Sequence, residues 1–179
     1  MNTSNENISA EMSVGVLELL RVAHEYCIFA ENADQKTIME ICDFFRKLGP
    51  LLYLKGALLP EVDPEFPEAD ERFVTEEEWQ AIFNEFRSVL SREDEYYRID
   101  HEEGLPYEAI KASLSENFTD IYQDLKDFLL LYQKNTRDAR QNAVHDCRML
   151  FENRWGLKLL ENLRFIHYLI NKEKLPLED

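Results

Sequence analysis

Three carboxylates at helical spacing carry the clearest chemical signal in this sequence. In Asp120-Ile-Tyr-Gln-Asp124-Leu-Lys-Asp127 the acids recur at i, i+4 and i+7, so a helix would align them in one stripe. Paired carboxylates on a helix can hold Mg²⁺ when a facing helix adds more oxygen ligands. No second acidic pair at short helical spacing stands out. We therefore favour an ion pair of Asp124 with Arg154 or Arg164 over metal binding.

The alternative hypothesis keeps the metal. In that hypothesis Asp120 and Asp124 are the metal ligands of an all-helical hydrolase that acts on a phosphorylated small molecule. The sequence contains no nucleophile elbow, phosphate-binding glycine loop, zinc-type ligand spacing or EF-hand pattern. Catalytic residues are therefore unknown at this level, and neither a metal nor a cofactor is predicted beyond this weak alternative.

The histidines give weaker signals. His24 and His167 fall on apolar helical stripes, which is more typical of core residues than of ligands, although the two could converge on a polar pocket. His145-Asp146 resembles the doublet of all-helical metal phosphohydrolases, but helical projection turns His145 toward solvent. Asp100-His-Glu-Glu103 offers donors for a divalent ion on a flexible connector, where a solvated loop is the simpler interpretation.

Helical periodicity dominates the chain and predicts one all-α domain, an irregular bundle of about six helices. Five glycines and six prolines leave little turn chemistry for a fold of many strands. Asp34 is a plausible cap for the second helix, and Gly49-Pro50 should interrupt or kink it. Trp155-Gly156 is predicted as a joint between the last two helices. The helices are expected at about 12–31, 35–48 with a possible continuation over 51–59, 76–90, 110–132, 135–151 and 159–170.

The start of the third helix is the most specific local pattern. Thr75-Glu-Glu-Glu78 matches a capping box, in which the Thr75 hydroxyl accepts from a helical N–H and Glu78 reaches back to the Thr75 N–H. Its three carboxylates also suit the positive end of the helix dipole.

Charge is divided unevenly along the sequence. Residues 61–103 hold sixteen Asp or Glu against four Arg, a local charge of −12 in a chain whose net charge is −16. Residues 134–174 hold nine Lys or Arg against five acids, a local charge of +4. Most of the acidity falls in two predicted connectors, 61–74 and 91–106. Such a field can stabilise the fold internally or select partners by sign.

Length and composition indicate one domain over residues 13–174, with a flexible N-terminus at 1–12 and a tail at 175–179. Cys27, Cys42 and Cys147 each fall on an apolar helix side, which favours free thiols and a cytoplasmic setting. The acidity argues against nucleic acid or an anionic membrane surface as a partner. No run approaches the ~20 apolar residues of a membrane span.

The chain resembles an uncharacterised all-helical bacterial domain family without assigned function. The resemblance rests on Asp120-Ile-Tyr-x-Asp124-Leu-Lys126, on Arg154-Trp155-Gly156 and on Leu163-Arg164-x-x-His167, and it spans most of the chain. It implies a helical fold and a bacterial cytoplasmic setting but no reaction. Members of the family often carry His at the position of Lys158. The motif residues that the resemblance marks for a shared pocket are Asp120, Tyr122, Asp124, Arg154, Trp155 and His167.

The leading functional hypothesis is a non-enzymatic interaction or accessory module that binds a protein with a basic surface. Its basis is the acidic segment with interleaved aromatic residues that we expect to be exposed, since charge steers encounter and rings supply contact area. These aromatic residues are Phe66, Phe73, Tyr96 and Tyr97. Whether the protein is a monomer or a homo-oligomer stays open, and the apolar segment 128–132 is the part that self-association would cover.

Overall fold

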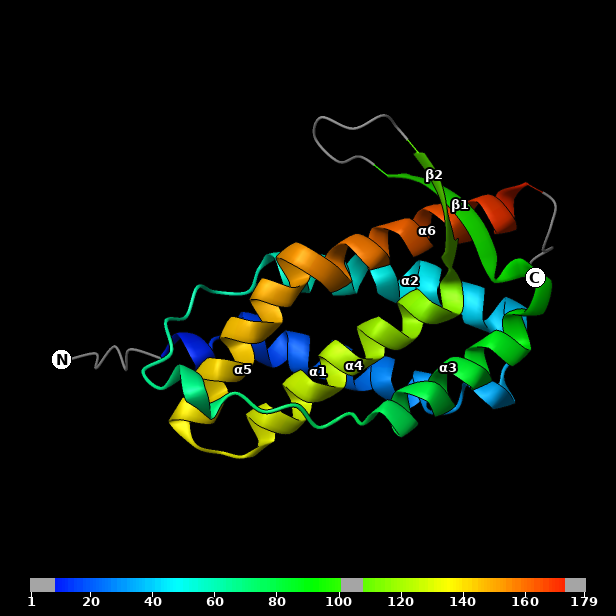
Figure 1. Ribbon diagram of the computed structural model, residues 1–179. Helices are drawn as coiled ribbons and strands as arrows, with labels where there is room; N and C mark the ends of the chain where they lie inside the picture. The colour runs from blue at the N-terminus through cyan, green and yellow to red at the C-terminus, as the bar shows by residue number, and fades with distance from the viewer. Residues whose placement is uncertain (1–8, 101–107, 173–179) are drawn as a thin grey trace.

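The computed structural model describes residues 9–100 and 108–172. They form the predicted all-α bundle together with one small β-hairpin (Figure 1). Short 3₁₀ turns stand at Ala10–Met12, Ala33–Gln35, Pro67–Ala69 and Ser91–Glu93, and a π-helical turn at Phe151–Trp155 joins the last two helices. The helices are α1 (Val14–Ala30), α2 (Ile38–Ala57), α3 (Glu76–Leu90), α4 (Leu114–Gln133), α5 (Arg137–Leu150) and α6 (Gly156–Asn171).

Helix α4 is the centre of the bundle. It packs against α1, α3, α5 and α6, while α2 packs against α1 and α6. Figure 1 shows α3, α4 and α5 on the near side, with α1 and α2 behind them. Every residue from Asn117 to Tyr122 is buried, so this helix has almost no solvent face. Polar side chains on a helix enclosed in this way need partners from its neighbours, because an unpaired buried polar group is costly.

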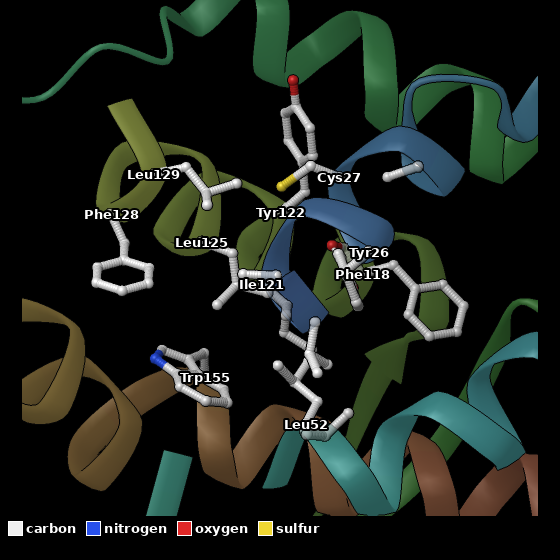
Figure 2. Close-up of a cluster of buried hydrophobic side chains, with 14 of the residues drawn as sticks. Tyr26, Cys27, Leu52, Phe118, Ile121, Tyr122, Leu125, Phe128, Leu129 and Trp155 are labelled. Carbon is white, nitrogen blue, oxygen red and sulfur yellow. The ribbon is translucent and has the colours of Figure 1, made fainter. Parts of the chain in front are cut away.

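Aromatic and aliphatic side chains from all six helices form the core, part of which Figure 2 shows around α4. Phe118 stacks on Phe45 of α2 with 3.8 Å between ring centroids. Tyr26 of α1 is fully buried, and its hydroxyl donates to the Phe118 carbonyl over 3.0 Å. The residues 128–132 of α4 are almost entirely buried within the chain itself, apart from half-buried Leu130. Self-association is therefore not needed to cover that segment.

The second acidic connector contains regular structure that the sequence interpretation missed. Residues Glu95–Asp100 form β1, which pairs antiparallel with β2 at Glu108–Ser113, with Glu95 opposite Ser113. The hairpin projects beyond α6 (Figure 1). Predicting Ile110 as part of the fourth helix was therefore wrong. The sequence Tyr-Tyr-Arg-Ile has the aromatic and β-branched content of a strand, but its acidic surroundings obscured the pattern.

Helix α2 also differs from the expectation. Its cap is Thr37, which forms a capping box with Glu40, and not Asp34. The helix continues through Pro50 without a break. Pro50 is exposed, so the carbonyl that loses its hydrogen bond to the missing N–H can bind water instead. The predicted capping box of Thr75 and Glu78 at the start of α3 is confirmed.

The buried face of α1 is rotated from the predicted stripe. Leu17 and Ile28 are exposed at 49% and 44%, and His24 is exposed as well. The core side is formed by Leu19, Val22 and Tyr26 together with the predicted Val16, Ala23 and Cys27. Apolar residues surround most of this helix, so periodicity alone does not decide which part faces inward. Predicting His24 as a core residue was wrong for this reason.

The joint between α5 and α6 is not a break. The π-helical turn carries the chain from one helix into the next, and Gly156 has ordinary helical dihedrals. A Cβ at Gly156 would stand 2.4 Å from the Phe151 carbonyl oxygen. Glycine is therefore required by crowding, because the wider turn brings that carbonyl inward, and not by a helix end as predicted.

The three cysteines are free and buried, as their positions on apolar helix sides predict. Over the described ranges, no helix has the length and apolar character to cross a membrane.

Candidate functional site

Three of the six predicted pocket residues meet in one cluster of charges. Nη1 of Arg154 donates to Oδ1 of Asp124 over 2.9 Å, and Nη2 of Arg154 lies 3.3 Å from Oδ1 of Asp120. The side chain of Asp124 has no exposed surface. Arg154 is thus the partner of Asp124 out of the two that the sequence proposed. Arg164 instead reaches the backbone carbonyl of Tyr97, 3.4 Å away.

The other three predicted pocket residues lie elsewhere. The hydroxyl of Tyr122 donates to Oε1 of Glu31 at the end of α1, which Lys126 also binds over 2.6 Å. Trp155 is fully buried and donates from Nε1 to the Cys147 carbonyl over 3.1 Å. His167 is exposed on α6, so its expected place in the core was wrong. The residues of the α4 motif therefore lie on two opposite faces of the helix.

Two residues that sequence reasoning missed complete the cluster. Nζ of Lys158 lies 2.8 Å from Oδ2 of Asp120, and Nε1 of Trp79 donates to Oδ1 of the same carboxylate over 2.9 Å. Lys158 stands four residues after Arg154, a spacing that places both on one helix face. From that spacing the sequence could have predicted that Lys158 lies beside Arg154. For Trp79 the sequence indicates only that its N–H needs a hydrogen-bond partner if the ring is packed inside.

The third acid of the stripe, Asp127, fastens the first acidic connector to the bundle. Its Oδ1 accepts from the backbone N–H groups of Phe73 and Val74 at 2.8 and 2.9 Å. Its Oδ2 pairs with Arg72 at 3.1 Å, and Arg72 also lies 3.5 Å from Oδ1 of Asp124. The three carboxylates therefore bind the residues around the start of α6 and the segment that leads into α3.

Burial makes the charged form of Asp124 unfavourable. Burial raises the pKa of Asp124 to about 6, although Arg154 and Arg72 act in the opposite direction. Its Oδ2 is buried without a hydrogen-bond partner, and Asp124 lines a cavity of about 10 Å³. Asp146, from the His145-Asp146 doublet, lines the same cavity. Burial and the neighbouring carboxyl of Asp70 raise the pKa of Asp146 to about 6. A cavity of this size holds about one water molecule.

The arrangement does not resemble a preformed metal centre. Across residues 9–100 and 108–172, no group of three or more His, Cys, Asp or Glu side chains is placed to hold a metal ion. Asp120 and Asp124 face Arg154 and Lys158, whose charges a bound cation would have to displace. The predicted donor cluster around His101 lies outside the described residues.

A polar groove opens on the solvent side of Arg154 and Lys158. It has a volume of about 370 Å³ and is bounded by the hairpin, the first turn of α4, the π-helical turn and the start of α6. Its lining is predominantly charged and polar, with Leu157 as one apolar contributor. The lining residues used below are Arg98, Lys111, Glu116, Asn117, Asn153 and Glu161.

The first acidic connector is ordered by contacts with α5. Side chains of α5 bind its backbone: Nδ1 of His145 to the Val62 carbonyl at 2.9 Å, and Nδ2 of Asn142 to the Phe66 carbonyl at 2.8 Å. His145 is therefore half-buried, and the prediction that it points to solvent was wrong. Val62 and Pro64 are buried while the residues between and beside them are exposed, as in an extended strand that lies on a surface.

This connector and the first turn of α3 present unpaired negative charge, and we call residues 61–77 the acidic segment. Of its acids, Glu71 pairs with Lys134. Six further exposed carboxylates have no cationic partner within the described part of the chain: Glu61, Asp63, Glu65, Glu68, Glu76 and Glu77.

The aromatic residues of this region are not all exposed. Phe66 and Tyr97 are exposed at 45% and 70%, whereas Tyr96 is buried at 5% and Phe73 is half-buried beneath the Lys134 ammonium. Tyr96 turns inward because β1 alternates its side chains and its hydroxyl binds Asn117 of α4. The expectation of four exposed rings was therefore wrong for Tyr96.

Comparison with known proteins gives a family and a fold. The model of a domain of unknown function, DUF5063, matches residues 11–172. The chain is also similar to protein BF1032 from Bacteroides fragilis, known from a crystal structure, with 31% identity and a TM-score of 0.82. That match covers 94% of this chain and 100% of the other. No curated protein matches. This chain therefore belongs to the DUF5063 family.

Proposed function

We propose that this protein is a non-enzymatic interaction module and that its acidic segment binds a partner with a basic surface. The observation that carries the proposal is the set of six exposed, unpaired carboxylates between residues 61 and 77. Neutralisation by the basic helices α5 and α6 is incomplete there. A negatively charged surface accelerates association with positively charged partners and disfavours association with acidic ones.

Rigidity of the segment supports the proposal further. Side chains of α5 hold three backbone groups of the connector, the carbonyls of Val62 and Phe66 and the N–H of Glu65, and also the carbonyl of Leu59 just before it. A partner therefore does not have to order the segment on binding, which lowers the entropic cost of association. Phe66, exposed among the acids, offers an apolar contact at the middle of this surface.

The experiment is affinity capture with three forms of the full chain at roughly 50 and 500 mM salt, which changes the screening length several-fold. The test variant combines Asp63→Asn, Glu65→Gln and Glu68→Gln. The matched control combines Glu25→Gln, Asp34→Asn and Glu108→Gln, which removes the same charge from exposed positions outside both the segment and the polar groove.

The expected result is a basic protein that the wild type and the control retain at low salt, and that the test variant loses. Its retention should fall at high salt. A specific partner whose binding is insensitive to salt, or one that the test variant binds as well as the wild type, contradicts the proposal.

A further inference from the structure

The groove beside the ion-pair cluster gathers positive charge in a protein whose net charge is −16. Its lining carries four cations, Arg98, Lys111, Arg154 and Lys158, against the two acids Glu116 and Glu161. It lies between the hairpin and α6, on elements separate from the acidic segment. A volume of about 370 Å³ falls within the range of small-molecule sites, roughly 300–1,000 Å³.

The carboxylates that pair with Arg154 and Lys158 lie behind them. The side chains of Arg154 and Lys158 are exposed at 34% and 26%, whereas that of Asp120 is exposed at 12% and that of Asp124 at 0%. A solute that enters from the groove therefore meets the cations first. The buried acids fix the positions of the cations without facing the groove.

Both cations keep donors beyond those that the fold uses, since the contacts of Arg154 to Asp124, Asp120 and Gln123 occupy at most three of its five N–H groups. Nζ of Lys158 contacts Oδ2 of Asp120 at 2.8 Å and Oδ1 of Asn117 at 3.3 Å, which leaves one of the three ammonium N–H groups. Asn117 is itself oriented, because its amide nitrogen donates to Tyr96 and Asn162. The Lys158 ammonium is thus held from two directions and preorganised for a third acceptor.

The π-helical turn is the local irregularity that builds this wall. It sends Trp155 into the core while the preceding Arg154 reaches Asp124 and borders the groove. π-turns of this kind occur frequently at functional sites, since the wider turn is less favourable than a regular helix. Phe151 and Trp155 pack closely at this turn, with 4.8 Å between their ring centroids.

We propose that this groove binds a small molecule through an oxyanion group, a phosphate or a carboxylate, which Lys158 and Arg154 contact directly. Lys111 and Arg98 of the hairpin also line the groove, and each has an acidic neighbour, Glu95 at 2.6 Å and Glu161 at 3.4 Å. Phosphate and carboxylate oxygens accept from ammonium and guanidinium groups alike. Asp120 and Asp124 are positioning residues in this proposal. It is independent of the acidic segment, and either proposal can fail without the other.

The probes are inorganic phosphate and succinate, each compared with sodium chloride at equal ionic strength. Thermal denaturation and isothermal titration are measured on the full chain. The expected result is a saturable rise in melting temperature with at least one probe, which chloride does not reproduce. A response to phosphate alone assigns a phosphorylated ligand, and a response to succinate alone assigns a carboxylate. Equal behaviour of both probes and chloride overturns the proposal.

The decisive variant is Lys158→Gln, which should weaken binding of the active probe at least tenfold. Lys134→Gln is the matched control, since Lys134 pairs with Glu71 outside the groove, and it should bind like the wild type. If Lys158→Gln does not fold, Lys111→Gln decides, because that side chain is 56% exposed and its loss does not threaten the core. Lys111→Gln should weaken binding several-fold. Unchanged affinity in the folded groove variants refutes the site.

Discussion

The guanidinium of Arg154 lies 2.9 Å from a carboxylate, Asp124, that has no exposed surface. This contact joins the π-helical turn to the central helix. Removing one member of a buried ion pair leaves the other charge without compensation, which costs more than the intact pair contributes. The nearby guanidinium of Arg72, 3.5 Å from Asp124, reduces that cost only in part because it is 47% exposed.

Arg154→Met should therefore destabilise the protein by about 2–4 kcal/mol near neutral pH. Urea denaturation measures the change. Without Arg154, the pKa of Asp124 rises further above about 6, so the carboxyl is protonated in mild acid and the cost should shrink near pH 5. Arg46→Met is the control, since Arg46 pairs with Asp43 on the surface and should cost less than about 1 kcal/mol. An equal loss in both variants would contradict a buried pair.

Asp146→Asn should stabilise the protein near pH 7.5. The pKa of Asp146 is raised from 3.8 to about 6 in the fold, so the folded chain holds a proton that the unfolded chain releases earlier. Stability from this proton is complete below pH ~4 and is lost as pH rises through about 6. Asparagine carries no charge at any of these values, so we expect a gain of about 1 kcal/mol at neutral pH and little at pH 4.5.

Urea titrations at the two pH values test that difference. Asp63→Asn, which removes an exposed carboxylate of the acidic segment, serves as the comparison and should not show the same gain. A gain for Asp146→Asn that is the same at both pH values would mean that ionisation is not its cause.

Local patterns in the sequence predicted local structure well. The capping box at Thr75 and the positions of the buried cysteines depend on a few neighbouring residues, and both are confirmed. The capping residue of α2 failed because Thr37-x-x-Glu40 offers the same chemistry three residues after Asp34. Two caps within one turn of each other compete, and the reciprocal pair forms here.

Long-range pairing was harder to predict. The sequence limited the partner of Asp124 to Arg154 or Arg164, because an enclosed acid needs a cation, and the structure selects Arg154. Lys158 and Trp79 come from α6 and α3, so their meeting at Asp120 depends on how these helices cross α4. The hairpin also depends on pairing between two segments, β1 and β2, and neither segment shows a clear alternation of apolar and polar residues that would predict a strand. The exposed side of α1 could not be chosen because both sides are apolar.

The metal hypothesis for Asp120 and Asp124 leads to a direct measurement. Mg²⁺ or Mn²⁺ would have to compete with Arg154 and Lys158 for the same oxygens, so we expect no specific rise in melting temperature in the wild type. Asp124→Ala is the reference for any non-specific effect of the salts. A saturable rise in the wild type that Asp124→Ala abolishes would restore the hydrolase hypothesis.

Close packing of α2 against the π-helical turn gives the sharpest stability prediction. A Cβ at Gly56 would stand 2.5 Å from ring atoms of both Phe151 and Trp155. Trp155 is fully buried and fixed by its hydrogen bond to Cys147, so it has little room to move. Overpacking of this kind costs typically about 1–3 kcal/mol, more than the helix propensity of alanine returns. Gly56→Ala should therefore lower the free energy of unfolding by an amount in that range.

Gly15→Ala is the matched control for this substitution. Gly15 also lies in a helix, but its added Cβ would meet only the Leu58 carbonyl oxygen at 3.5 Å, an ordinary contact. Alanine should therefore stabilise that position by up to about 1 kcal/mol. Opposite signs for the two variants in urea denaturation would attribute the Gly56 cost to the rings of Phe151 and Trp155. A neutral Gly56→Ala would show instead that the π-helical turn can shift, and Arg154 would then not be rigidly held at the groove.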